Sequence, residues 1–168
     1  AHDAAYSPAA MAPLADINAR IAHTAKLAGR EAAEVTLVAI SKTYEAAAIA
    51  PLLAAGQRVF GENRVQEAQG KWPELRENFP DVRLHLVGQL QSNKAEDAVR
   101  LFDCIHSLDR PSLITALAKA FDKLDRVLPC FVQVDIGNEP QKGGCAIADL
   151  TALLAEATMT VDVLRRFV

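Results

Sequence analysis

The sequence predicts an α/β protein built as a (β/α)8 barrel of the TIM type that is incomplete at its C-terminal end. Short apolar, β-favouring segments alternate strictly with helix-compatible ones, and parallel strands need such helical crossovers. No glycine-rich turn follows the first strand, whereas a doubly wound nucleotide-binding sheet normally has one. Only five to six βα units can be counted in 168 residues, although a complete barrel takes about 200–250 residues.

The expected elements follow one another along a single βα-barrel domain, residues 1–168. Residues 1–10 are small and polar and are expected to form a disordered tail. Apolar residues then recur at helical spacing from Leu14 to Ala28, and Gly29 is placed to end this helix. Strands are expected at residues 35–41, 58–61, 84–88, 104–107 and 130–136. Helices are expected at residues 45–55, 63–78, 92–100 and 111–126.

Composition and charge limit the possible functions. Hydrophobic residues make up 51% of the chain and aromatic residues only 5%, so the core must consist mainly of aliphatic side chains. The net charge is -3, and the 18 basic residues are scattered among 21 acidic ones without a run that could neutralise consecutive phosphates. No apolar stretch approaches the roughly 20 residues of a membrane span. We therefore expect a cytoplasmic protein that binds neither nucleic acid nor membrane, and a monomer if the barrel is complete.

Cysteines and histidines give no metal-binding motif along the chain. Cys104, Cys130 and Cys145 form no CxxC pair and are expected to be reduced thiols. His85 and His106 fall in strand-like segments, where a histidine is more often a hydrogen-bonded packing residue, and no HxxH or HxxxH spacing accompanies them. The sequence therefore predicts no metal site.

Lys42 is the leading candidate for a functional side chain. In a βα-barrel the functional groups come from the carboxyl ends of strands, and Lys42 directly follows the apolar strand VTLVAIS. A lysine held there would be partly desolvated, which disfavours the ammonium form and supplies the neutral amine that attacks an aldehyde. The position thus favours a Schiff-base lysine, with an ordinary solvated lysine at a strand end as the alternative.

Polar side chains at other strand ends each have a plain structural alternative. Asn63 follows the second strand, where it could contact a ligand or cap the next helix together with Gln66. Ser92 and Asn93 precede another helix in the same way. Lys142 lies in a glycine-containing loop, and it could approach a phosphate or an aldehyde or be an ordinary surface lysine.

Five segments, taken in order, carry a family resemblance. They are residues 37–43 (LVAISKT), 60–67 (FGENRVQE), 86–94 (LVGQLQSNK), 105–109 (IHSLD) and 131–143 (FVQVDIGNEPQKG). Together they resemble the pyridoxal 5′-phosphate (PLP) homeostasis proteins, relatives of the alanine racemase N-terminal barrel, from about residue 35 to residue 154. The resemblance implies a barrel of that type, in which Lys42 carries PLP as a Schiff base and Asn63 lies beside the cofactor.

The resemblance also carries an expectation about function. Proteins of this family are regarded as PLP carriers or regulators of vitamin B6 and amino-acid pools, which implies PLP binding without catalytic turnover. Amino acids or PLP-dependent apoenzymes are the further partners it implies. A PLP-dependent amino-acid racemase is the alternative, but no residue is a compelling second base. The predicted cofactor-binding residues are Lys42, Asn63, Ser92, Asn93, His106 and Lys142, with no catalytic residue assigned.

The C-terminal segment departs from the family pattern. Residues 158–168 (TMTVDVLRRFV) do not resemble the family, although residues 160–164 have the composition of a sixth strand. The family segments that supply most of the phosphate cradle and the arginine facing the pyridine nitrogen are not found in this sequence. A third hypothesis is therefore a truncated barrel with impaired PLP binding.

Overall fold

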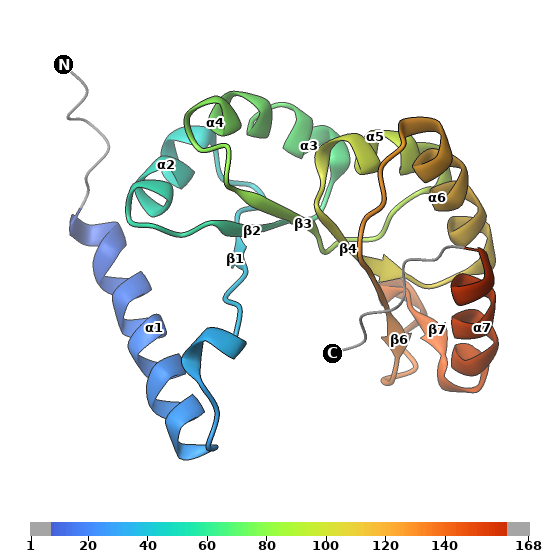
Figure 1. The fold of residues 1–168 in the computed structure, drawn as a ribbon, viewed down its shortest axis with the longest axis horizontal. Coiled ribbons are helices and arrows are strands. Elements are labelled where there is room, and N and C mark those ends of the chain that lie inside the picture. The colour runs from blue at the N-terminus through green and yellow to red at the C-terminus, as the bar shows by residue number, and fades with distance from the viewer. Residues whose placement is uncertain (1–7, 161–168) are drawn as a thin grey trace.

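The computed structural model of the protein describes residues 8–160, and its centre is a curved, five-stranded parallel sheet (Figure 1). The strands lie side by side in the order β1-β2-β3-β4-β5, which is their order along the chain. A doubly wound sheet reverses its strand order at a switch point, whereas a barrel adds each new strand on the same side. The prediction of a partial βα-barrel is therefore confirmed.

The first four strands of this sheet are each followed by helical segments that cover its convex side (Figure 1). The strands are β1 (Ala39–Ile40), β2 (Val59–Glu62), β3 (Arg83–Leu86), β4 (Cys104–Leu108) and β5 (Cys130–Val132), and a second sheet pairs β6 (Val134–Asp135) with β7 (Cys145–Ala146). The α-helices are α1 (Pro8–Leu27), α2 (Ala46–Ala54), α3 (Val65–Gln69), α4 (Trp72–Asn78), α5 (Ala95–Leu101), α6 (Pro111–Leu124) and α7 (Leu150–Thr160). Short 3-10 turns are η1 (Ala32–Glu34), η2 (Ser92–Lys94), η3 (Pro140–Lys142) and η4 (Ile147–Asp149).

The hydrophobic core lies between the convex face of the sheet and the helices. Successive side chains of a strand point to opposite faces, so Leu84 and Leu86 of β3 are fully buried in the core while His85 between them points to the concave face. Phe60 of β2 and Ile105 of β4 belong to the same core layer. This alternation divides the strand residues into a core set and a concave set, and the strand histidines His85 and His106 belong to the concave set.

The N-terminal helix begins earlier than the sequence predicts. Residues 8–10, expected to belong to the disordered tail, form the first turn of α1, because a proline at the first helical position has a suitable φ and needs no N–H partner. Residues 1–7 of the predicted tail lie outside the described residues. Gly29 has a φ of 67° in the left-handed region and follows the end of α1, as predicted.

Two predicted strands are shorter than their apolar runs. The strand expected at residues 35–41 is reduced to β1, because only Ala39 and Ile40 pair with β2 at the edge of the sheet. The strand expected at residues 130–136 is divided between β5 and β6, since the register with β4 shifts and the chain passes into the second sheet at Gln133. Apolar composition identified these segments, but hydrogen-bonding partners determined where each strand ends.

The helix predicted at residues 63–78 is two helices, α3 and α4. Lys71 separates them with a non-helical backbone, and Pro73 in the first turn of α4 has no N–H with which to continue a helix from α3. The alternative capping roles of Asn63, Ser92 and Asn93 are not found, because Arg64 is the N-cap of α3, Gln91 that of η2 and Lys94 that of α5.

The segment expected to form a sixth strand lies mostly outside the described residues. Thr160 is the last residue of α7, and residues 161–168 are not described. Within residues 8–160, none of the helices is both long and apolar enough to cross a membrane.

Candidate functional site

Lys42 lies where the sequence places it, directly after β1 at the carboxyl end of the sheet, but its side chain is exposed. The expectation that Lys42 is partly desolvated is therefore wrong in this structure. The reason is the position of β1, which is an edge strand: among the described strands it pairs with β2 alone. The backbone of Lys42, in contrast, is tightly held.

The backbone on both sides of Lys42 is bound by one buried side chain, Lys71. The ammonium group of Lys71 donates hydrogen bonds to the carbonyl oxygens of Ser41 and Tyr44, each at 2.9 Å. Lys71 is only 6% exposed, so these bonds form in a poorly solvated setting where a charged donor is strong. Lys71 therefore clamps the turn that carries Lys42.

Glu67 holds the same turn from another direction. Its carboxylate accepts a hydrogen bond from the backbone N–H of Thr43 and forms an ion pair with Lys71 at 3.1 Å. The Thr43 N–H, followed by Lys71, lowers the pKa of the Glu67 carboxyl below its usual value. Thr43 has a φ of 66°, a left-handed conformation that is rare for a β-branched residue and needs support from its surroundings.

Glu62 completes this arrangement at the end of β2. It is fully buried, and its Oε1 accepts hydrogen bonds from Ser41 Oγ at 2.7 Å and from Trp72 Nε1 at 3.0 Å. The same oxygen lies 2.9 Å from the Lys71 ammonium. We call Glu62, Glu67 and Lys71 the buried ion cluster; sequence reasoning missed it, since its members meet only after β2 and the α3–α4 break bring them together.

A cleft of about 370 Å³ opens beside the carboxyl ends of β2 and β3. Two predicted site residues, Asn63 and Lys142, line it together although they are far apart in the sequence. Its lining consists of Asn63, Arg64, Val87, Gly88, Gln89, Gln133, Gln141 and Lys142. The Lys142 ammonium pairs with Glu139 at 2.8 Å, and its side chain is exposed. This cleft therefore lies between the loop that carries Lys142 and the strand ends.

Two other predicted residues lie beside this cleft rather than in it. A neighbouring cleft of about 400 Å³ shares Asn63 and Arg64 and adds Lys94. Ser92, at the start of η2, is 3.4 Å from the Arg110 guanidinium, which donates to its hydroxyl. Asn93 is exposed. The structure thus gives Ser92 a contact with Arg110 and leaves Asn93 open to solvent.

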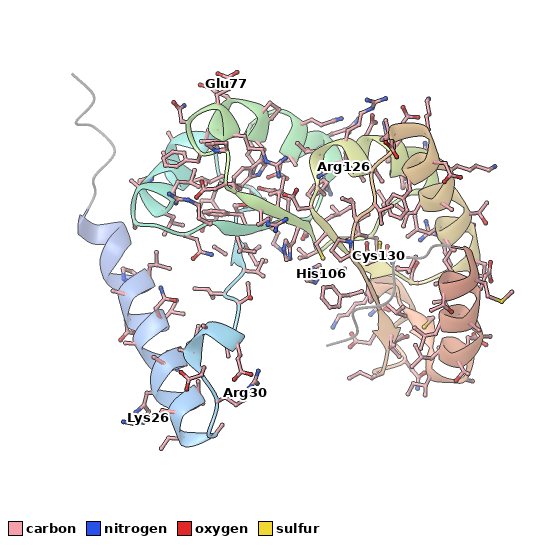
Figure 2. All side chains as sticks on the ribbon, in the orientation of Figure 1. Lys26, Arg30, Glu77, His106, Arg126 and Cys130 are labelled. Carbon is pink, nitrogen blue, oxygen red and sulfur yellow. The ribbon has the colours of Figure 1, made fainter. Side chains whose placement is uncertain are left out.

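His106 lies on the concave side of the sheet, two residues before the end of β4 (Figure 2). Its Nε2 is 2.9 Å from Nδ1 of His85, and its ring packs against Phe131 with centroids 4.8 Å apart. Burial lowers the pKa of His106, and burial with the neighbouring His106 lowers the pKa of His85 to about 4. The prediction of a hydrogen-bonded strand histidine is confirmed, and its partner is the other strand histidine.

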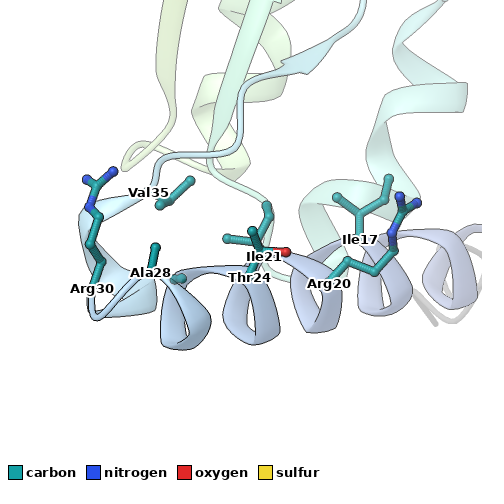
Figure 3. A pocket seen from close by; sticks show the side chains of 8 residues that line it. Ile17, Arg20, Ile21, Thr24, Ala28, Arg30 and Val35 are labelled. Carbon is teal, nitrogen blue, oxygen red and sulfur yellow. The ribbon is translucent and has the colours of Figure 1, made fainter.

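A larger cleft, of about 480 Å³, lies away from the strand ends between α1 and the segment that follows it (Figure 3). It is lined mainly by aliphatic side chains, with Arg20 and Arg30 at its rim. It contains none of the predicted site residues, and its lining offers no nucleophile or acid–base pair. The candidate functional groups lie instead at the carboxyl end of the sheet.

The donor set at this end suits a small phosphorylated aldehyde. An aldehyde requires an accessible amine, and Lys42 offers one that makes no hydrogen bond or ion pair within residues 8–160. A phosphate requires cations or N–H donors, and Arg64 and Lys142 line the nearby cleft. Glycine at position 88 lets the chain approach closely there, since a Cβ would lie 2.3 Å from the carbonyl oxygen of Asn63.

Gly88→Ala is expected to lower the free energy of unfolding by roughly 1–3 kcal/mol, because the added methyl group would force the segment after β3 and the Asn63 backbone apart. Urea denaturation measures this change. Gly70→Ala is the matched control, since a Cβ there would be 3.5 Å from its nearest neighbour atom, an ordinary contact. Equal stability of the two variants would contradict the close approach of Asn63 and Gly88.

Comparison with known proteins places these features in a family. The family described as alanine racemase, N-terminal domain, matches residues 14–164. The pyridoxal phosphate homeostasis protein of Pseudomonas aeruginosa is 41% identical over 152 residues, which cover 90% of this chain and 65% of that protein. The protein of the same name from Escherichia coli K12 is 38% identical over 146 residues, covering 84% of this chain and 61% of that protein.

Among solved structures, PipY of Synechococcus elongatus with PLP bound is similar to this chain. The TM-score is 0.71 at 42% sequence identity, and the match covers 83% of this chain and 65% of PipY. The chain therefore spans less than two thirds of the length of each of these three relatives.

Proposed function

Because the chain belongs to the alanine racemase N-terminal domain family, and within it to the pyridoxal phosphate homeostasis proteins, we propose that it binds PLP as a Schiff base on Lys42. The observation that carries this proposal is the exposed Lys42 amine on a clamped turn at the carboxyl end of the sheet. PipY, with which the chain shares its fold, is a protein whose structure has PLP bound.

The neighbouring strand end supports the same assignment. The backbone N–H of Ser41 donates to the carbonyl oxygen of Gly61 at 2.9 Å, so the ends of β1 and β2 lie side by side. Lys42 follows Ser41, and Asn63 follows two residues after Gly61, where its amide can donate to and accept from a ligand. Lys42 and Asn63 would therefore contact the same small molecule from adjacent strands.

We assign separate roles in PLP binding to the residues of this site. Lys42 would form the carbon–nitrogen double bond to the aldehyde carbon, with the aldehyde oxygen leaving as water, and Arg64 and Lys142 would attract the phosphate. The buried ion cluster would keep the Lys42 turn in place. PLP, when bound, supplies an electron sink for reactions at the α-carbon of amino acids.

We further propose that the protein holds PLP without catalytic turnover. An amino-acid racemase needs acid–base groups that remove and return the α-proton. Across residues 8–160, no acid–base side chain makes a hydrogen bond or ion pair with the Lys42 side chain. Accumulation of D-alanine or D-serine from the L-isomer, with catalytic amounts of PLP-loaded protein, would contradict this part of the proposal and favour a racemase.

Lys42→Ala is expected to abolish the covalent PLP adduct. Wild-type protein incubated with PLP and reduced with borohydride should gain the mass of one phosphopyridoxyl group, located on Lys42 by peptide mass spectrometry. The variant should show no adduct and no visible Schiff-base absorbance.

Lys119→Ala is the control, because Lys119 is an exposed lysine on α6. It should keep the full adduct. Labelling of Lys42→Ala at the wild-type level, or wild-type labelling spread evenly over several lysines, would overturn the assignment of Lys42.

A further inference from the structure

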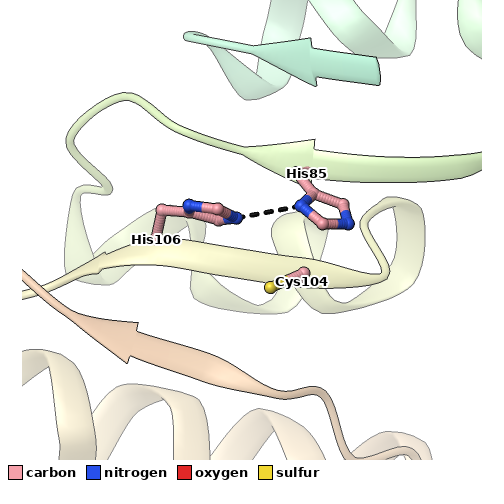
Figure 4. A group of neighbouring side chains, drawn as sticks. All are labelled: His85, Cys104 and His106. Atoms are coloured by element: carbon pink, nitrogen blue, oxygen red, sulfur yellow. Dashed lines mark hydrogen bonds between the residues drawn. The ribbon is translucent and has the colours of Figure 1, made fainter. Parts of the chain in front are cut away.

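We propose that His85, Cys104 and His106 form a binding site for one divalent transition-metal ion of the zinc class on the concave face of the sheet. One ligand atom from each residue, a ring nitrogen or the thiol sulfur, lies within 4.8 Å of the other two (Figure 4). The site shares no residue with the Lys42 turn, although its His106 is also among the residues that the sequence predicts to bind PLP.

The strand register explains why these three side chains meet. His85 of β3 is the direct partner of Cys104 of β4, and partners in a parallel sheet point to the same face. His106 follows Cys104 by two residues and so returns to that face. The three ligands thus come from neighbouring strands, and the spacing of residues along the chain does not reveal a site that depends on this register.

The ligand set has the chemistry that zinc prefers. Zn²⁺ is bound by imidazole nitrogen and thiolate sulfur, commonly in tetrahedral sites where an open position holds water. The two histidines are partly exposed, so a water molecule can reach a fourth position, while Cys104 is only 3% exposed. When the ion binds, the Cys104 thiol forms the sulfur–metal bond and its proton goes to solvent.

The histidine pair needs only a small movement to reach the geometry of a metal site. His85 Nδ1 and His106 Nε2 are 2.9 Å apart and share one proton in a hydrogen bond. Two nitrogens on a tetrahedral zinc ion are roughly 3.3 Å apart, given Zn–N bonds of about 2.0–2.1 Å. Metal binding therefore moves the shared proton to another ring nitrogen and opens the pair by a few tenths of an ångström.

Cobalt(II) is the probe, because tetrahedral Co²⁺ absorbs visible light and a thiolate ligand adds a near-ultraviolet charge-transfer band. Titration of the chelator-treated 168-residue chain with Co²⁺ should produce both bands and saturate at one ion per chain. Zn²⁺ should remove both bands by displacement. If the wild-type chain shows no charge-transfer band, the proposal is overturned, and this test needs no variant.

Three substitutions, His85→Gln, Cys104→Ser and His106→Gln, test the ligands individually. Each should weaken Co²⁺ binding by more than about 100-fold, since loss of even an outer partner of a metal ligand typically costs about 10–100-fold in affinity. Cys104→Ser should in addition abolish the charge-transfer band. Circular dichroism shows whether each variant is folded.

Matched controls exist for both residue types. His23 is an exposed histidine on α1 and Cys145 a buried cysteine on β7, so His23→Gln and Cys145→Ser should bind Co²⁺ like the wild type. Protection of Cys104 from alkylation by Zn²⁺ in the wild-type chain provides a measurement that does not depend on the folding of a variant. Equal Co²⁺ affinity of all five variants would overturn the site, as would alkylation of Cys104 that Zn²⁺ does not slow.

Discussion

Lys71→Met is expected to lower the free energy of unfolding by about 3–5 kcal/mol, because Glu62 would remain buried without its cationic partner. Glu62 is fully buried and Lys71 is 6% exposed. Water therefore cannot solvate the carboxylate that is left when the ammonium group is removed. Urea denaturation followed by the fluorescence of Trp72, the single tryptophan of the chain, measures the change.

The prediction has a control and a rescue. Lys119→Met removes an exposed lysine and should change the stability by no more than about 0.5 kcal/mol. The double variant Glu62→Gln, Lys71→Met removes both buried charges and should recover part of the loss, because an unpaired charge costs more than a neutral pair. If Lys71→Met costs no more than Lys119→Met, the Lys71–Glu62 ion pair does not stabilise the fold.

Lys71→Met also distinguishes the role of Lys71, which holds the backbone of the turn, from that of Lys42, which supplies the reactive amine. Lys71 holds the backbone at Ser41 and Tyr44, while Lys42 between them is unchanged in the variant. We therefore expect the PLP adduct to form on Lys42 more slowly and at a higher PLP concentration, but still on Lys42. Peptide mapping of the borohydride-reduced variant distinguishes this outcome from loss of the site.

Trp72→Ala is expected to have an effect of similar size, about 3–5 kcal/mol, because it removes a large aromatic ring from a closed part of the core. Trp72 is 0% exposed, and its ring lies 5.1 Å from that of Phe60. The variant lacks tryptophan, so far-ultraviolet circular dichroism in urea replaces fluorescence as the measurement.

Trp72→Phe distinguishes packing from hydrogen bonding at this position. It keeps an aromatic ring but loses the N–H that donates to Glu62 Oε1 at 3.0 Å, so about 1–3 kcal/mol should be lost. Trp72→Ala and Lys71→Met both act on Glu62, and their effects should therefore not add. A loss as large in Trp72→Phe as in Trp72→Ala would show that the hydrogen bond, and not the packed ring, dominates.

Sequence patterns predicted the central strands closely and the outer ones poorly. β2, β3 and β4 begin and end within two residues of their expected bounds, because each is an interior strand with hydrogen-bonded partner strands on both sides. β1 and the β5–β6 boundary deviate because a strand ends where its hydrogen-bonding partner ends. Composition contains no information about that partner.

Some site residues could be identified from local sequence, and others could not. Lys42 and Asn63 were identified by their position after apolar strands, and Lys142 by its glycine-containing loop, so local sequence was sufficient. The buried ion cluster was missed, because Glu62 and Lys71 are ordinary charged residues in the sequence and only the break between α3 and α4 turns Lys71 inward.

The sequence by itself determined the family, the βα order of the elements and the place of Lys42 at the end of a strand, because these depend on local periodicity and on motifs. Only the tertiary structure decided that the Lys42 side chain is exposed while its turn is clamped from the core. It also decided that His85 and Cys104 are strand partners. These contacts depend on strand register and on which strand lies at the edge of the sheet, and both arise only when distant segments pair.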